Sequence, residues 1–206
     1  MWKIKKIRLP TIAEWNALVA VSSSKNHVLH WETMLSWCQD AAPDWQMFRA
    51  VMGWTSADYR SFCKASSRHA CVGLRPALEV LNSDALGPDG TIVVAGTLYM
   101  DGQPVKNPEN PIYNGDIANY TAGTRLELRD AMDDPAYQVQ AIKVGNVLVA
   151  DRVLLRYISW EDCNVCLNLG FTPGKQLIFL NGKGFLLSEV AKKLGITEEL
   201  HSVQIF

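Results

Sequence analysis

The chain has 206 residues, of which 48% are hydrophobic and 20% are charged, and its formal net charge at pH 7 is −1. This composition is typical of a globular chain long enough for one large domain or two small ones. The balanced charge argues against a nonspecific nucleic-acid coat and against a polybasic protein of the membrane surface.

The cysteines and the N-terminus indicate the compartment. Five cysteines, an odd number at uneven spacing, favour free thiols in a reducing environment. The first residues are charged and lack the apolar stretch of a secretory signal, and no apolar run approaches the length of a membrane span. We therefore expect a cytoplasmic protein, or one assembled in the cytoplasm into a particle, with no membrane partner.

The N-terminal segment predicts a short strand followed by a capped helix. Thr11 is a good N-cap, and Glu14 three residues later completes a capping box. Trp15 lies on the apolar face of this helix with Ile12 and Leu18, so it is predicted to be a core residue. The preceding basic residues Lys3, Lys5, Lys6 and Arg8 fit either a protected edge strand or a contact with phosphate.

The middle of the chain, residues 27–62, is rich in aromatic side chains and poor in periodicity. Trp31, Met34, Leu35 and Cys38 fit one face of a short helix, and Gly53-Trp54-Thr55-Ser56 is typical of a turn. The remainder is predicted to form loops. A strong strand follows at residues 71–81.

A domain boundary is predicted at residues 82–90, which are dense in turn-forming residues. Beyond it, Asp101-Gly102 and Gly145-Asn146 each indicate a hairpin between β-rich runs. Residues 106–124 are rich in Asn, Pro and Gly and predict a long loop, a kind of segment that is often functional.

The C-terminal part predicts one further helix, a hairpin and a short last helix. Ser159 can cap a helix, with Asp162 at its third position and Gly170 at its end. Asn181-Gly182 is a strong hairpin signal. Residues 188–194 are predicted to be a short helix.

Motifs of known chemistry are incomplete, so no catalytic residue, metal or cofactor is predicted. Cys163 and Cys166 face the same way on a helix, but a zinc site needs two more ligands, and no second pair has the usual spacing. His27, His30, His69 or Cys71 would have to supply them, so buried free thiols are the preferred interpretation. Residues 170–176 imitate a phosphate loop but are one residue short and end in Gln.

Two segments carry a resemblance: RLPTIAEW at residues 8–15 and GLRPALE at residues 73–79. Together they resemble the two ends of a C-type lectin-like domain, as found in formylglycine-generating-enzyme-like domains and in phage and mobile-element proteins from Firmicutes. The resemblance implies an α+β fold, with a lectin-like unit at residues 1–86 and a β-rich unit at residues 87–206. It also places Glu14 against Arg75, as a structural ion pair.

The resemblance does not extend to the family's active sites. The surroundings of Cys63 and Cys71 do not match the enzymes' cysteine motif. Glu109-Asn110-Pro111 has the wrong order for the calcium-binding lectin motif, and Trp15-Asn16 is followed by Ala17 where that motif needs Asp. Neither the enzyme activity nor calcium-dependent sugar binding is therefore implied.

What remains is a non-enzymatic phage or mobile-element protein that recognises a macromolecular partner through aromatic loops. One alternative is a soluble inhibitor of host defence, either an anti-CRISPR protein or a nucleotide-signal sponge; another is a degenerate formylglycine-generating-like enzyme. We expect a protein partner, with guide RNA or a nucleotide as alternatives. The predicted binding residues are Trp31, Trp37, Trp45, Trp54, Tyr59, Arg49, Arg60 and Arg68, and the alternative is that the tryptophans are buried.

Overall fold

The structure, a computed structural model, describes residues 3–25, 29–30, 34–45 and 47–169, together with two short strands at 177–180 and 183–186. The α-helices are α1 (Ile12–Ser24) and α2 (Trp160–Leu169), and short 3₁₀ turns lie at Ser83–Leu86 and Pro135–Tyr137. The strands are β1 (Lys3–Arg8), β2 (Leu35–Ala41), β3 (Phe48–Gly53), β4 (Arg60–Lys64), β5 (Val72–Leu74), β6 (Ala77–Leu81), β7 (Ile92–Met100), β8 (Gln103–Pro104), β9 (Ala118–Asn119), β10 (Leu126–Arg129), β11 (Val139–Val144), β12 (Val147–Ala150), β13 (Leu155–Arg156), β14 (Leu177–Leu180) and β15 (Lys183–Leu186). The predicted α+β class is confirmed.

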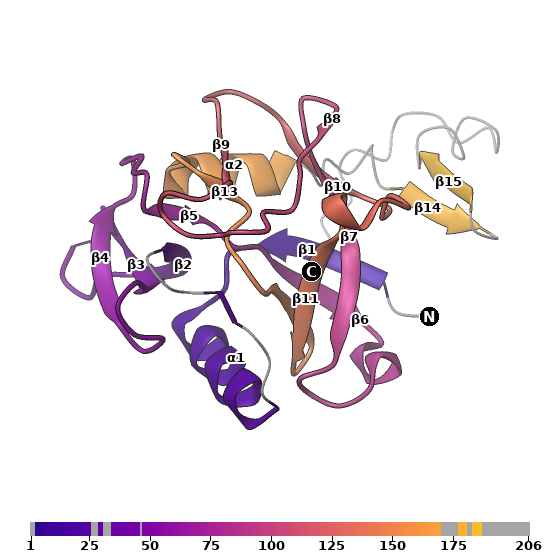
Figure 1. Cartoon of the computed structure of the whole chain (residues 1–206), viewed down its shortest axis with the longest axis horizontal. Helices are drawn as coiled ribbons and strands as arrows, with labels where there is room; N and C mark the ends of the chain where they lie inside the picture. The colour runs from indigo at the N-terminus through magenta and orange to yellow at the C-terminus, as the bar shows by residue number, and fades with distance from the viewer. Residues whose placement is uncertain are drawn as a thin grey trace, which may run out of the picture.

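Two sheets form the framework of the molecule (Figure 1). The seven-stranded sheet has the order β1-β6-β12-β11-β7-β10, with β8 also paired to β7, and the six-stranded sheet has the order β4-β3-β2-β5-β13-β9. Both sheets contain strands from either side of the boundary expected at residues 82–90. The two predicted units therefore share one hydrogen-bonded framework.

Two segments of the chain run side by side as they cross from one sheet to the other. The predicted single strand at 71–81 is two strands, β5 and β6, which belong to different sheets. Its partner segment runs through β12 and β13, and the bonds Leu154 N to Leu74 O (2.8 Å) and Ala150 N to Pro76 O (3.0 Å) continue the pairing across the crossing. Arg75 lies at this crossing and is fully buried.

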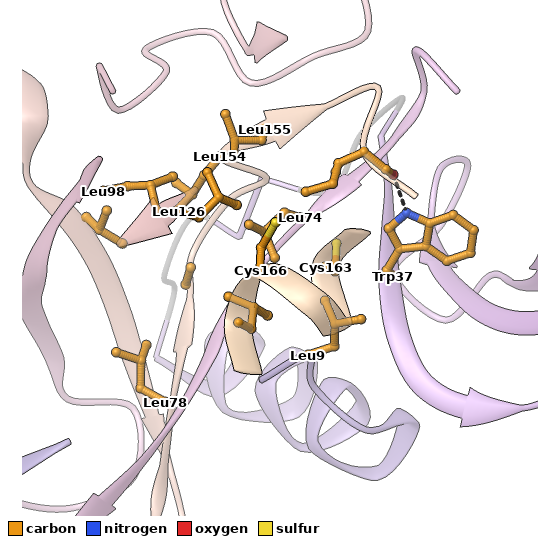
Figure 2. Packing of buried hydrophobic residues seen from close by; sticks show 14 of the residues in the cluster. Leu9, Trp37, Leu74, Leu78, Leu98, Leu126, Leu154, Leu155, Cys163 and Cys166 are labelled. Atoms are coloured by element: carbon orange, nitrogen blue, oxygen red, sulfur yellow. Dashed lines mark hydrogen bonds between the residues drawn. The ribbon is translucent and has the colours of Figure 1, made fainter. Parts of the chain in front are cut away.

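The main core lies between the sheets and beneath α2. Trp37, Leu74, Leu155 and Cys163 belong to it, and Figure 2 shows the Trp37 indole donating a hydrogen bond into this cluster. The acceptor is the carbonyl oxygen of Ile158, 2.8 Å away. A buried indole N–H normally finds such a partner, so Trp37 is a core residue.

The helix α1 packs against strands of both sheets. Leu18 belongs to one hydrophobic cluster with residues of β6, β11 and β12, and Trp15 belongs to another with Cys38, Ala50 and Met52 of β2 and β3. The predicted capping box is present: Glu14 N donates to Thr11 Oγ1, and Thr11 N donates to Glu14 Oε2. The prediction that Trp15 is buried is confirmed.

α2 begins with a second capping box, also as predicted. Asp162 N donates to Ser159 Oγ at 3.0 Å, and Ser159 N donates to Asp162 Oδ2 at 3.0 Å. The hairpins predicted at Asp101-Gly102 and Gly145-Asn146 are confirmed as β7–β8 and β11–β12. β14 and β15 pair on either side of Asn181-Gly182, although this turn lies outside the described residues, as do residues 170–176 and 188–194.

Two further predictions are wrong. A short helix was expected at Trp31, Met34, Leu35 and Cys38, but Leu35 and Cys38 belong to the strand β2, which pairs with β3 and β5. Much of the predicted loop region is thus sheet. The pair expected between Glu14 and Arg75 is also replaced, because Glu14 pairs with Arg8 at 2.5 Å.

Candidate binding surface

The connection between β2 and β3 exposes two large apolar side chains. Trp45 is 65% exposed and Met47 is 64% exposed. Pro43 ends the preceding strand, and a tight turn follows, in which Phe48 N donates to Trp45 O at 2.9 Å and Ala42 N donates to Phe48 O at 3.1 Å. The turn therefore holds Trp45 outward at the end of the hairpin.

Trp45 lies next to the side chains on one face of β3 and β4. Its ring lies 5.3 Å from that of Phe48, at a tilt of 52°. Phe48 is opposite Lys64, and Phe62 is opposite Ala50, so both phenylalanines share the face that turns toward α1. We define the β3–β4 surface as Trp45, Met47, Phe48, Arg60, Phe62 and Lys64.

Cations border this apolar strip. Arg60 and Lys64 are exposed at the two ends of β4, and within the described residues neither forms an ion pair. The guanidinium of Arg60 lies 6.0 Å from the ring centre of Phe62. Tyr59 is 39% exposed and directly precedes Arg60. The surface therefore combines aromatic residues with Met47 and Arg60, residue types that are enriched at protein interfaces.

Other predicted binding residues have structural contacts instead. Arg49 lies on the opposite face of β3, where its guanidinium stacks 4.2 Å from the ring of Trp160. Arg68 forms a bidentate pair with Asp162, with both distances 2.8 Å. These two arginines connect the six-stranded sheet and its following loop to α2.

The four predicted tryptophans divide into different environments. Trp37 is fully buried, which corrects its assignment to the binding surface. Trp54 is half-buried against the main core and has a positive φ of 90°, a conformation unusual for a bulky residue. Trp31 lies outside the described residues. Among these four, Trp45 is the one that the structure shows largely exposed.

A small polar cavity lies elsewhere, between β1, β2 and α2. Its volume is about 110 Å³, and its lining includes Lys6, Gln39, Trp160 and Asn164. Arg8 also lines it, but its guanidinium is held by Glu14 and by Glu79, at 2.5 and 2.6 Å. Burial raises the pKa of Glu14, but the hydrogen bonds from Arg8 and Thr11 outweigh burial and hold that pKa below its usual value.

The cysteine pair of α2 faces the core. Burial raises the pKa of both Cys163 and Cys166, and Cys166 Sγ lies 3.2 Å from the hydroxyl of Tyr120. Thiols with raised pKa values are poor nucleophiles at neutral pH. In the part of the chain that the structure describes, no three His, Cys, Asp or Glu side chains are grouped as metal ligands.

The predicted loop at 106–124 is held to the framework by hydrogen bonds. Tyr120 N donates to Arg156 O at 2.9 Å, and Arg152 Nη1 donates to Pro108 O at 2.7 Å. The Asp116 carboxylate accepts hydrogen bonds from two backbone amides of the same loop. This loop lies against β13 through β9, on a different edge of the sheet from β4.

The sequence alone could not show which of these side chains are exposed to solvent. Met47, Phe48 and Phe62 were not singled out as binding residues, and the shared face of Phe48 and Phe62 follows only from the register of β3 and β4. Alternation along residues 60–64 is a weak indication of a half-buried strand.

Comparisons with protein-family models, with curated proteins and with solved structures found no match to this chain. No helix in the described part of the chain is long and apolar enough to cross a membrane.

Proposed function

We propose that this protein is a non-enzymatic C-type lectin-like binding module of a phage or mobile element, which recognises a partner protein through the β3–β4 surface. The lectin-like class and the mobile-element origin rest on the resemblance of residues 8–15 and 73–79. Binding takes place in the host cytoplasm or on a particle assembled there.

The observation that carries the proposal is the exposure of Trp45 beside Met47. Scattered apolar side chains are normal on a protein surface, but Trp45 and Met47 are both largely exposed within three residues, and the Trp45 ring lies against half-buried Phe48. Tryptophan is the residue type most enriched at interaction hot spots. The cations at Arg60 and Lys64 favour an acidic partner surface.

The proposal is tested by affinity capture from a lysate of the native host. The immobilised full chain is compared with Trp45→Ala and with the control Tyr113→Ala, which removes an aromatic side chain of 40% exposure from the loop at 106–124. We expect a protein that is retained by the wild type and by Tyr113→Ala but is reduced at least about tenfold by Trp45→Ala.

Equal retention by all three proteins would contradict the proposed site. The identity of the retained protein also separates the two functional classes. A virion component supports a particle-associated role, whereas an effector of host defence supports the inhibitor.

A further inference from the structure

The strand β4 ends the six-stranded sheet on one side. In the described part of the chain β4 pairs only with β3, and Figure 1 shows it at the outer margin of its sheet. Its register with β3 is regular from Arg60 to Lys64, with no bulge. An edge of this kind presents unpaired backbone groups that can hydrogen-bond to a further strand.

The phase of the β3–β4 ladder shows which backbone groups are unpaired. Gly53 N donates to Tyr59 O at 3.0 Å, and Ala65 N donates to Met47 O at 2.8 Å. In an antiparallel pair the residues that bond to the partner strand alternate with those that do not. Residues 59, 61, 63 and 65 therefore bond inward, so the N–H and C=O groups of Arg60 and Phe62 and the N–H of Lys64 point away from β3.

The other sheet edges are less open. β1 carries three lysines within residues 3–6 and a register shift between Ile4 and Lys6, both of which hinder pairing. β9 has two residues, and β10 has four residues with a charged network among Arg125, Glu127 and Arg129. β4 is therefore the longest regular edge that these sheets leave without a partner on one side.

The side chains of the outward-bonding residues have a definite pattern. Arg60, Phe62 and Lys64 alternate along the strand and so lie on one face, in the order cation, aromatic, cation. A strand added beside β4 would place its own alternate side chains next to these three. Trp45 and Phe48 extend the same apolar face at the Lys64 end of the strand.

We propose that β4 receives an extended segment of the partner protein as an additional strand. The segment places an apolar side chain beside Phe62 and acidic side chains beside Arg60 and Lys64. This inference rests on the proposed function and specifies its partner. Backbone hydrogen bonds supply affinity in such strand addition, and the alternate side chains supply specificity.

The test uses a displayed library of random twelve-residue peptides selected on the immobilised full chain. We expect the enriched peptides to share an acidic–any–apolar–any–acidic pattern without proline inside it, because proline cannot donate to the new ladder. A synthetic peptide of the enriched sequence then serves as the probe.

A pair of variants isolates the backbone contribution. Lys64→Ala and Lys64→Pro both remove the ammonium group, but the proline also removes an outward N–H without breaking a bond to β3. We expect Lys64→Pro to bind the probe at least about tenfold more weakly than Lys64→Ala, with both folded by circular dichroism. Arg60→Ala and Arg60→Pro provide the same comparison at the other end.

Amide hydrogen exchange of the wild-type protein is the second measurement. Bound peptide should slow the exchange of the Phe62 and Lys64 amides, because both become hydrogen-bonded. A library without enriched peptides, unchanged exchange at Phe62, or equal binding by the alanine and proline variants would overturn strand addition. If those results were found together with Trp45-dependent capture of a host or particle protein, they would refute strand addition as the binding mode but would still support the proposed function.

Discussion

Trp15 shows how one aromatic residue connects separate parts of the fold. Its side chain is fully buried, its Nε1 donates to Ala57 O at 2.6 Å, and the guanidinium of Arg75 lies 5.0 Å from its ring centre. The ring thus joins α1 to the β3–β4 connection and to the crossing at Arg75. The sequence predicted its burial because the helical periodicity around it is local.

Replacement of Trp15 by alanine should lower the free energy of unfolding by about 3–5 kcal/mol, as is usual for an emptied aromatic site. Denaturant titration measures the loss. Trp45→Ala is the matched control, because its side chain is exposed and its removal should change stability by about 0.5 kcal/mol or less. Equal stability of Trp15→Ala and the wild type would show that the site does not hold the core together.

Arg75 shows what the sequence could not predict. Glu14 was its expected partner, but among the described residues its guanidinium donates to Ser36 Oγ at 3.0 Å, to Ala150 O at 3.1 Å and to the carbonyl oxygen of His30. These acceptors are neutral and come from three different segments of the chain. The geometry of the sheet crossing decides these contacts, and that geometry depends on residues far away in the chain.

The environment of Glu14 leads us to expect that the free energy of unfolding depends on pH. Its pKa in the folded protein lies below the ordinary value for glutamate, about 4.3. A carboxyl group whose pKa is lower in the folded than in the unfolded protein stabilises the fold at any pH above its unfolded-state pKa. This contribution is lost as the pH falls through the folded-state pKa. Glu14→Gln should therefore cost about 1–3 kcal/mol at pH 7 and make stability less dependent on pH below about 5. Thermal unfolding at pH 7, 5 and 3 measures both effects, and parallel pH profiles for the two proteins would contradict the assignment.

At the scale of elements, local signals were reliable. Both capping boxes lie within four consecutive residues and were predicted correctly, at Thr11–Glu14 and Ser159–Asp162. The hairpin turns were also predicted, because their residue types demand particular backbone angles. Gly145, for example, has a φ of 59° in the turn between β11 and β12.

β2 shows where local signals fail. Leu35 and Cys38 have the spacing of a helical face, yet both lie in a strand that is buried on two faces. A strand covered on both sides does not alternate between apolar and polar residues, so its periodicity cannot be distinguished from that of a short buried helix. The pairing with β3 and β5 then determines the structure.

Gly73 tests the side-by-side course of the two crossing segments. A Cβ at this position would overlap the carbonyl oxygen of Leu155 and Cγ1 of Val153. Because one obstacle is backbone, Gly73→Ala should separate the strands and cost about 1–3 kcal/mol or more. Gly102→Ala is a control without nearby atoms, although its φ of 79° adds some strain. The melting temperatures of both variants provide the comparison, and a larger loss for Gly102→Ala would contradict the close approach at Gly73.

At the scale of the molecule, the surface could be predicted only in part. The aromatic segment was expected to bind, and Trp45 is exposed there, but Trp37 has the same residue type and is entirely buried. The residue type alone does not show which of the two side chains is buried. Their exposure depends on the order of the strands, because Trp37 lies on a central strand and Trp45 lies in a turn beside the sheet edge.

The most direct test of the proposed function is hydrogen–deuterium exchange of the full chain with and without the captured partner protein. The β3–β4 surface predicts slower exchange at residues 47–64, whereas the loop at 106–124 exchanges at the same rate in both states. Protection confined to residues 106–124 or to β1, with residues 47–64 unchanged, would contradict the account.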